Sequence, residues 1–211
     1  MEKKLTLTDI AGMDKRPRVQ LINSLPGFKS VNLIGTMGEG GNTNLAIFSS
    51  VIHIGSNPPL FGFITRPVTV TRDTYENIMA NGYFTINHVN PEIYKQAHQT
   101  SARYDKDTSE FSATGLTPEF IGDFAAPYVK ESHVKLGLQF VEKHPIETNG
   151  TILMIGKLQE VYFPENCLLE DGFLDLEKAG TITGSALDSY YQPQKIARLS
   201  YAKPDRPLKE I

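Results

Sequence analysis

Polar side chains that could bind a ligand gather in three places in the first half of the sequence. The first cluster is the segment 42–50, where amides and hydroxyls stand at the start and in the middle of an otherwise apolar run. Buried amides and hydroxyls are costly unless something bonds them, so this segment predicts contact with a ligand that carries many donors and acceptors. The alternative is a local role, in which Ser49 and Ser50 form a β-bulge and Asn44 caps a turn.

The second cluster is the segment 66–77, which begins with Arg66 and carries Arg72 just before a predicted helix. Helix N-termini present free N–H groups and the positive end of a dipole, which favours phosphate binding. Arg72 adds a forked donor that is always charged. The segment therefore predicts an anion site, unless Asp73 caps the helix and Arg72 pairs with a surface carboxylate instead.

The third cluster is the segment 97–101, which ends a predicted helix and precedes a long polar segment over 101–118. Polar residues in such a position either line a ligand or extend into water. A structureless loop of this length is uncommon in a compact domain, which favours a functional loop or a marginally ordered one.

Several other kinds of site are not indicated. The glycines between positions 35 and 41 do not form the dinucleotide fingerprint, and they lie between two predicted strands rather than before a helix. The sequence has no Walker A or H-E-x-x-H motif, and no two of its five histidines are three or four residues apart, so no metal site is expected. The single cysteine, Cys167, cannot form an internal disulfide and is interpreted as a structural residue.

The elements that must position the three clusters are mostly strands. Short apolar runs separated by Gly and Pro predict strands over 31–35, 45–54 and 60–65, which favours a β-rich sheet or barrel. Asp73 and Glu76 have the spacing of a capping box, which predicts a helix start. That helix should end before Gly82, followed by a strand over 83–89, a helix from Pro91 to about Gln99, a strand over 134–140, a turn at 149–150 and a long partner strand over 151–163.

The composition limits the class of protein. The chain has 211 residues and a net charge of −3, so a protein built around nucleic-acid binding is not expected. No stretch has the character of a signal peptide or a membrane-spanning helix. With its lone thiol, the chain is expected to be cytoplasmic and to form a single domain, with a core over about 18–163 and a C-terminal extension over 164–211.

The order of the clusters resembles a known family. The motifs N-T-N-L-A-x-F-S-S, P-P-L, R-P-x-T-x-x-R-D-T-x-x-N-I and F-T-I-N follow one another, and the segments 97–101 and 109–111 continue the series. Together they are similar to the flavin reductase-like family, near its flavoredoxin-like subgroup, over about residues 18–204. The resemblance implies an FMN-binding split barrel, mainly β with flanking helices. Its barrel would be six-stranded, antiparallel and of Greek-key order, and the protein would be a homodimer with FMN near the subunit interface.

The resemblance also implies roles for individual residues along the first cluster. Four of them correspond to the segment that runs along the isoalloxazine edge of FMN: Asn44, Leu45, Ala46 and Phe48. Ser49 and Ser50 correspond to the segment near the ribityl-phosphate.

In the other two clusters, the resemblance implies residues for the phosphate and for a closing loop. Arg72 and Thr74 correspond to the positions that hold the phosphate, and Arg66 could add to the local positive charge. Asp73 is a departure, because an acid beside a phosphate helps only if it points away to cap the helix. The loop that closes over the flavin corresponds to Gln99, Thr100 and Ser101.

The resemblance implies an FMN-dependent oxidoreductase that passes electrons from NAD(P)H to flavin or another acceptor. Hydride chemistry belongs to such a cofactor, which accounts for the lack of a visible catalytic triad or acid pair. No catalytic residue is singled out, although His88 and His98 are candidates for positioning a nicotinamide or protonating the flavin. Two alternatives stay open: an FMN electron-transfer protein that does not oxidise NAD(P)H directly, and a non-redox split-barrel protein that binds another ligand or none.

Overall fold

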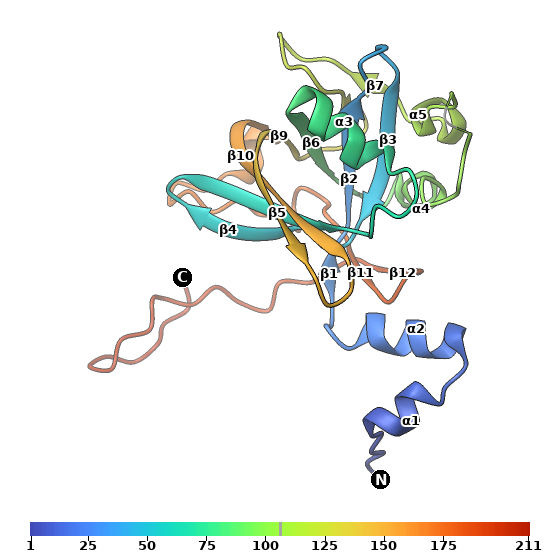
Figure 1. Ribbon diagram of the computed structural model, residues 1–211. Coiled ribbons are helices and arrows are strands. Elements are labelled where there is room, and N and C mark those ends of the chain that lie inside the picture. Colours follow the sequence, from blue (N-terminus) through green and yellow to red (C-terminus); the bar gives the residue numbers. More distant parts are fainter. Residues whose placement is uncertain (106) are drawn as a thin grey trace.

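The computed structural model describes residues 1–105 and 107–211, and its centre is a seven-stranded antiparallel sheet (Figure 1). The strand order is β3-β2-β6-β9-β10-β5-β4, so chain neighbours are often not sheet neighbours. This sheet confirms the expected antiparallel, mainly β architecture. Its strands are β2 (Asn32–Met37), β3 (Thr43–Phe48), β4 (Ile52–Ser56), β5 (Pro59–Thr65), β6 (Tyr83–His88), β9 (Lys135–Ile146) and β10 (Thr151–Tyr162).

The sheet has seven strands rather than six because the apolar run 45–54 is divided between two strands. β3 ends at Phe48 and β4 begins at Ile52. Between them, the hydroxyl of Ser50 donates to the carbonyl oxygen of Ile64 at 3.2 Å and accepts from its N–H at 3.1 Å. One side chain therefore satisfies both backbone groups of a β5 residue, and the chain can turn there without leaving them unpaired.

Three helices cover the β3 side of the sheet: α3 (Asp73–Asn81), α4 (Tyr94–Gln99) and α5 (Glu110–Thr114). Helix α3 begins and ends as expected, with Gly82 in the left-handed conformation at its C-terminus. The expected capping box is wrong, because Arg72 occupies the N-cap position without a side-chain cap and Asp73 is already the first helical residue. Helix α4 begins after Pro91, since the side chain of Asn90 accepts hydrogen bonds from the N–H groups of Glu92 and Ile93 in a turn.

Two hydrophobic clusters lie on opposite faces of the β2–β3 part of the sheet. One contains Ile34, Phe63 and Phe84 and fills the barrel, whereas the other contains Leu33 and Leu45 and packs against α4 and α5. Successive strand residues point to opposite faces, so neighbouring residues of β2 and β3 belong to different clusters. This alternation later decides which polar residues of β3 can reach a ligand.

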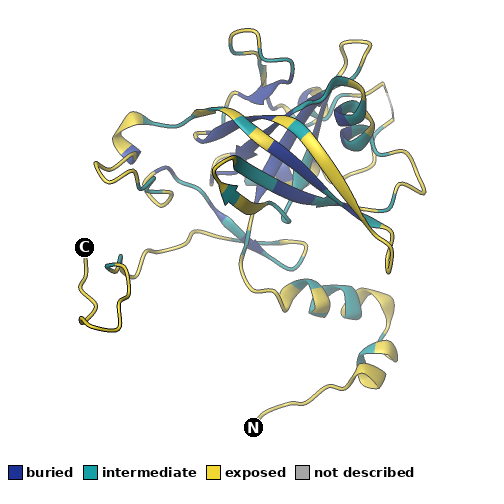
Figure 2. Cartoon of the chain, turned by 60° about the vertical axis from the view of Figure 1, so that its left-hand side comes forward, coloured by how far each residue is buried: buried dark blue, intermediate teal, exposed yellow. Residues whose placement is uncertain are grey.

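The N-terminal and C-terminal regions of the chain, called the chain ends below, pair beside the barrel in a small three-stranded sheet. Its order is β1 (Lys29–Ser30), β11 (Thr183–Ser185) and β12 (Ser189–Tyr191). Helices α1 (Leu7–Ala11) and α2 (Lys15–Ser24) project from it and have no buried residues, as their exposed surfaces in Figure 2 show. The remaining short elements are β7 (Pro118–Glu119), β8 (Tyr128–Val129) and a 3₁₀ turn, η1 (Glu165–Cys167). Among the described residues, no helix is long and apolar enough to cross a membrane.

Candidate functional site

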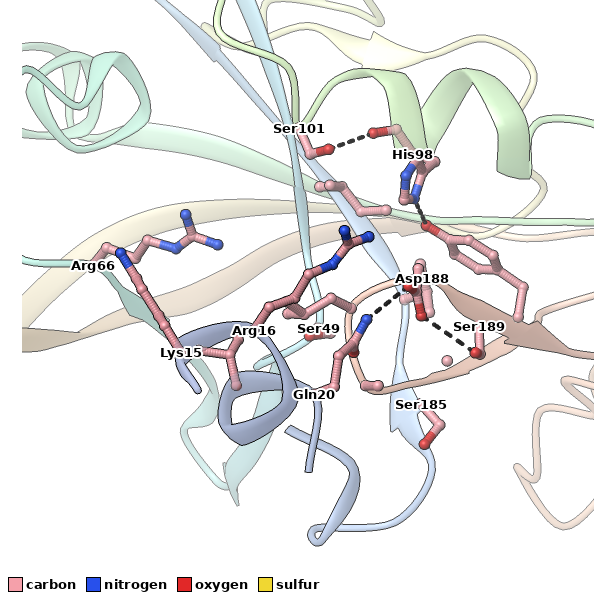
Figure 3. Close-up of a pocket in the computed structure, with 17 residues that line it drawn as sticks. Lys15, Arg16, Gln20, Ser49, Arg66, His98, Ser101, Ser185, Asp188 and Ser189 are labelled. Atoms are coloured by element: carbon pink, nitrogen blue, oxygen red, sulfur yellow. Dashed lines mark hydrogen bonds between the residues drawn. The ribbon is translucent and has the colours of Figure 1, made fainter. Parts of the chain in front are cut away.

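A pocket of about 630 Å³ opens between helix α2, the end of strand β3, the end of helix α4 and the β11–β12 hairpin (Figure 3). We call it the α2 pocket. Its volume is in the range of small-molecule and cofactor sites. Strand β3 contributes Ile47, the residues directly before β2 and after β3 contribute Val31 and Ser49, and the residue after β5 is Arg66. Segments more than 80 residues apart in the sequence therefore form one site.

Three cations line the α2 pocket against a single carboxylate. Lys15 and Arg16 come from the first turn of α2, and Arg66 follows β5. The only acid among the described lining residues is Asp188, which accepts a hydrogen bond of 2.8 Å from the side-chain amide of Gln20. The pocket is therefore positive overall, which suits an anionic ligand.

A histidine and a tyrosine are hydrogen-bonded to each other at the side of this pocket. Nδ1 of His98, in the last turn of α4, lies 2.7 Å from the phenol oxygen of Tyr190, on β12 (Figure 3). The rings meet edge to face, with centroids 5.8 Å apart. Burial, and then the charge of Asp188, raises the pKa of Tyr190. The phenol therefore stays protonated and can donate this bond.

Of the twelve residues predicted to bind the cofactor, the structure brings three together in the α2 pocket: Ser49, Arg66 and Ser101. The hydroxyl of Ser101 donates to the carbonyl of His98 at 2.7 Å. The hydroxyl of Ser49 makes no hydrogen bond to the described part of the chain, so it is available to a ligand. His98, one of the two candidate histidines, also lines the pocket.

Two other predicted residues, Asn44 and Thr74, form a hydrogen bond with each other rather than lining the α2 pocket. The amide of Asn44 donates to the hydroxyl of Thr74 at 3.1 Å and to that of Thr36 at 3.0 Å. Both residues are buried, and neither lines the α2 pocket. These bonds join the start of α3 to strands β2 and β3, which is a structural role between elements rather than the turn cap that the sequence left open for Asn44.

The alternation of β3 separates the remaining residues of the first cluster. Leu45 is fully buried in the cluster beneath α4 and α5, and Phe48 packs against the ring of Phe63 inside the barrel. Ala46 is half-buried and Ser50 bridges to β5, so neither lines the α2 pocket. Ile47 in β3 and Ser49 directly after it have the same parity as Leu45, and both reach the pocket.

The remaining predicted residues do not line the α2 pocket. Nε of Arg72 donates to the carbonyl of Pro67 at 3.4 Å. Gln99 is exposed and donates to the phenol oxygen of Tyr104, whereas Thr100 is buried and donates to a carbonyl within its own helix turn. His88 also lies outside the pocket, and its Nδ1 is 3.1 Å from the hydroxyl of Thr181.

A second pocket, of about 370 Å³, lies at the start of α3 and has the opposite charge. Six carboxylates line it and no described Lys or Arg does: Glu39, Asp73, Glu76, Asp105, Asp107 and Glu110. Burial raises the pKa of Glu110, while the N–H of Leu45 donates to its carboxylate at 3.0 Å and partly opposes that shift. The predicted phosphate site at the start of α3 therefore faces an acidic surface, which is unfavourable for an anion.

Sequence reasoning missed the residues that the two chain ends bring to the α2 pocket. Lys15 and Arg16 belong to a basic run, and Tyr190 belongs to a Tyr-Tyr pair, but neither pattern specifies a pocket. The contacts that join these ends, such as Gln20 to Asp188, span 168 residues of sequence. The β1–β11 pairing adds a second link that brings them to the same place.

The fold and the comparisons place the protein in the class of flavin reductase-like proteins with a split barrel. The chain belongs to the flavin reductase-like family, because the family model described as "Flavin reductase like domain" matches residues 28–177. A solved split-barrel structure from Shewanella frigidimarina NCIMB 400, assigned as a flavin reductase, is 54% identical. That match covers 95% of this chain and 100% of that one, with a TM-score of 0.92.

More distant solved structures share the fold. Nitrilotriacetate monooxygenase component B from Bacillus cereus is 20% identical, with a TM-score of 0.82 over 94% of this chain and 100% of that one. Flavoredoxin of Desulfovibrio vulgaris (Miyazaki F) is 23% identical, with a TM-score of 0.70 over 85% of this chain and 92% of that one. The expected resemblance to this family is therefore confirmed.

Proposed function

We propose that the protein is an FMN-dependent oxidoreductase that binds FMN in the α2 pocket and passes electrons from NAD(P)H to a flavin or another acceptor. Membership of the flavin reductase-like family supports the chemistry. The observation that carries the location is the cation Arg66 together with the hydroxyls of Ser49 and Ser101 in one pocket. This combination matches a phosphate monoester, which needs positive charge and hydrogen-bond donors.

The residues of the α2 pocket fit FMN at both of its ends. Arg66, Ser49 and Ser101 would hold the phosphate, while the apolar side chains of Val31 and Ile47 offer a wall for the planar ring system. Arg72 and Thr74 are less suitable for the phosphate, because the start of α3 lines the acidic second pocket. We therefore assign the phosphate to Arg66 rather than to Arg72.

When bound, FMN supplies the redox chemistry, because flavins accept a hydride from a reduced nicotinamide and pass the electrons on. The protein then has to bind the cofactor and the substrate, orient them, and exclude water from the site. His98 is the titratable side chain best placed to orient a ligand, since the hydrogen bond to Tyr190 limits the rotation of its ring. This role needs no nucleophile or carboxylate pair.

The visible spectrum of the purified protein tests the function. We expect a yellow protein, or a colourless one that acquires a flavin spectrum when FMN is added, and bleaching of that spectrum by NADH or NADPH without oxygen. Protein that stays colourless with FMN present would contradict the proposal. FMN binding without bleaching by either nicotinamide would instead identify an electron-transfer protein that receives its electrons from another donor.

A matched pair of variants tests the location of the phosphate. Arg66→Ala should weaken FMN binding by about 10- to 100-fold, the cost of a lost hydrogen bond to a charged group. Riboflavin, which has no phosphate, should bind the variant and the wild type equally. Arg72→Ala should leave FMN affinity nearly unchanged, and the reverse pattern would place the phosphate at the start of α3.

We also propose that the protein is a homodimer. The exposed apolar side chains of the two chain ends support this, because Leu25 and Phe28 follow α2, and Ile196 and Tyr201 lie in the extended C-terminal segment. A second copy of the chain could cover these exposed apolar side chains, because large exposed apolar surfaces are typical of protein interfaces. Analytical ultracentrifugation should give twice the chain mass of 23.5 kDa, and a monomer at micromolar concentration would contradict the proposal.

A further inference from the structure

One wall of the α2 pocket comes from parts of the chain that the family model does not match. The family segment, 28–177, supplies Arg66 and the hydroxyls of Ser49 and Ser101. The opposite wall consists of α2 and the β11–β12 hairpin, which lie before and after that segment. The pocket therefore has a family half and a half that is made by the chain ends.

The half made by the chain ends carries its own pair of cations. Lys15 and Arg16 are consecutive residues in the first turn of α2, and both are exposed. Figure 3 shows their side chains extending from the helix in different directions beside the pocket. Within residues 1–105 and 107–211, neither side chain makes an ion pair or a hydrogen bond. Positive side chains oppose the dipole at the start of a helix. The first turn of α2 has no acidic residue, and Asp14 at the N-cap position makes no capping hydrogen bond with its side chain. Local sequence choices that oppose folding are expected at functional sites.

Helix α2 is held in place over the pocket by contacts to the hairpin rather than by a buried face. The amide of Gln20 donates to Asp188 at 2.8 Å, and the ammonium of Lys29 donates to the carbonyl of Ala186 at 3.1 Å. Phe28 packs edge to face on Tyr191, with ring centroids 4.8 Å apart. Lys29 and Phe28 follow α2, and the ammonium of Lys29 also donates to the carbonyl of Asn23 in α2 at 3.1 Å. Together these contacts hold the backbone of α2, from which Lys15 and Arg16 extend, beside the pocket.

We propose that Lys15 and Arg16 form a second anion site that recognises a phosphate monoester on the second substrate, which for a nicotinamide donor is the 2′-phosphate of NADPH. The inference rests on the proposed function, in which Arg66 already serves the phosphate of FMN. A phosphate monoester carries close to two negative charges at neutral pH, which two cations can balance. In Rossmann-fold enzymes, a different fold, an Arg near the ribose accommodates the 2′-phosphate, so an arginine is chemically suited to this group.

The test compares NADP⁺ and NAD⁺, which differ only in that phosphate, on the FMN-loaded protein. Calorimetric titration should show that the wild type binds NADP⁺ more tightly than NAD⁺. The double variant Lys15→Ala/Arg16→Ala should lose about tenfold or more of its NADP⁺ affinity and keep its affinity for NAD⁺ and FMN. The ratio of kcat/KM for NADPH over NADH should fall by the same factor. The substitutions should not unfold α2, because alanine favours helix and the removed charges oppose the dipole.

The matched control is Lys3→Ala/Lys4→Ala, which removes two exposed positive charges from the same end of the chain. This control should keep the wild-type preference. Equal affinity of the wild type for NADP⁺ and NAD⁺ would overturn the inference, as would the same loss in the control. Loss of FMN rather than NADP⁺ in the double variant would also overturn it, since the two cations would then hold the flavin phosphate. A wild-type protein that binds no FMN would instead mark the failure of the proposed function.

Discussion

The phenol oxygen of Tyr190 and Nδ1 of His98 lie 2.7 Å apart, which joins the C-terminal hairpin to helix α4 across 92 residues of sequence. Because burial raises the pKa of Tyr190, the phenol keeps its proton at neutral pH, and we predict that it donates this proton to Nδ1. The proton of a neutral His98 must then be on Nε2. The hairpin thus determines which ring nitrogen of His98 can donate to a ligand.

Replacing Tyr190 tests this tautomer assignment. In the wild type, long-range ¹H–¹⁵N correlation spectra should show His98 as the Nε2–H form. Tyr190→Phe removes the donor to Nδ1, so the spectra should shift toward a mixture of the two tautomers. Tyr191→Phe, which changes the adjacent exposed tyrosine, should leave the His98 signals unchanged. A wild-type Nδ1–H tautomer would contradict the assignment.

His88 should make stability depend on pH. Burial lowers the pKa of His88 from 6.5 to about 4. His88 is therefore protonated near pH 6.5 in the unfolded chain but only near pH 4 in the folded chain. The free energy of unfolding is highest above pH 6.5 and decreases as the pH falls between these two values. The loss in the free energy of unfolding amounts to about 3 kcal/mol.

Chemical denaturation between pH 8 and pH 4 measures that loss, and His88→Asn serves as the comparison. Asparagine can still bond to the hydroxyl of Thr181 but cannot be protonated in this range. The free energy of unfolding of the variant should therefore depend less on pH than that of the wild type. Parallel pH profiles for the two proteins would mean that His88 is not the group responsible.

Glu110 should have the opposite effect on stability. Burial raises the pKa of this carboxyl, so ionisation is harder in the folded chain than in the unfolded one. Glu110→Gln keeps an oxygen that can accept from the N–H of Leu45 and should raise the free energy of unfolding at pH 7. The difference between variant and wild type should shrink as the pH falls and the carboxyl becomes protonated. Glu92→Gln, at an exposed position, should show no comparable gain.

Gly35 should tolerate no side chain. A Cβ at this position of β2 would overlap the carbonyl oxygen of Pro127 and the hydroxyl of Thr85, and the first of these is backbone that cannot rotate away. Gly35→Ala should therefore cost about 3 kcal/mol of unfolding free energy. Gly40→Ala, where nothing lies within 4 Å, should change stability by less than about 0.5 kcal/mol in the same denaturation experiment.

Local patterns in the sequence predicted most strands of the central sheet and the helices α3 and α4. The end of α3 at Gly82 and the strand Thr151–Tyr162 follow from a left-handed glycine and from apolar periodicity, which depend on near neighbours. The ordered polar motifs were also enough to indicate the family. The division of the run 45–54 was not predictable, because Ser50 bonds to Ile64 on a strand that comes later in the chain.

The tertiary structure decided which polar residues share a site. The motif around Asn44 reads as one cluster in the sequence, yet strand alternation sends Ser49 to the α2 pocket while Asn44 bonds to Thr74. Likewise, Arg66 and Arg72 are equal candidates by charge, and only the acids gathered near α3 distinguish them. The cations of α2 reach the pocket because the two chain ends pair through β1 and β11, a contact that no local pattern encodes.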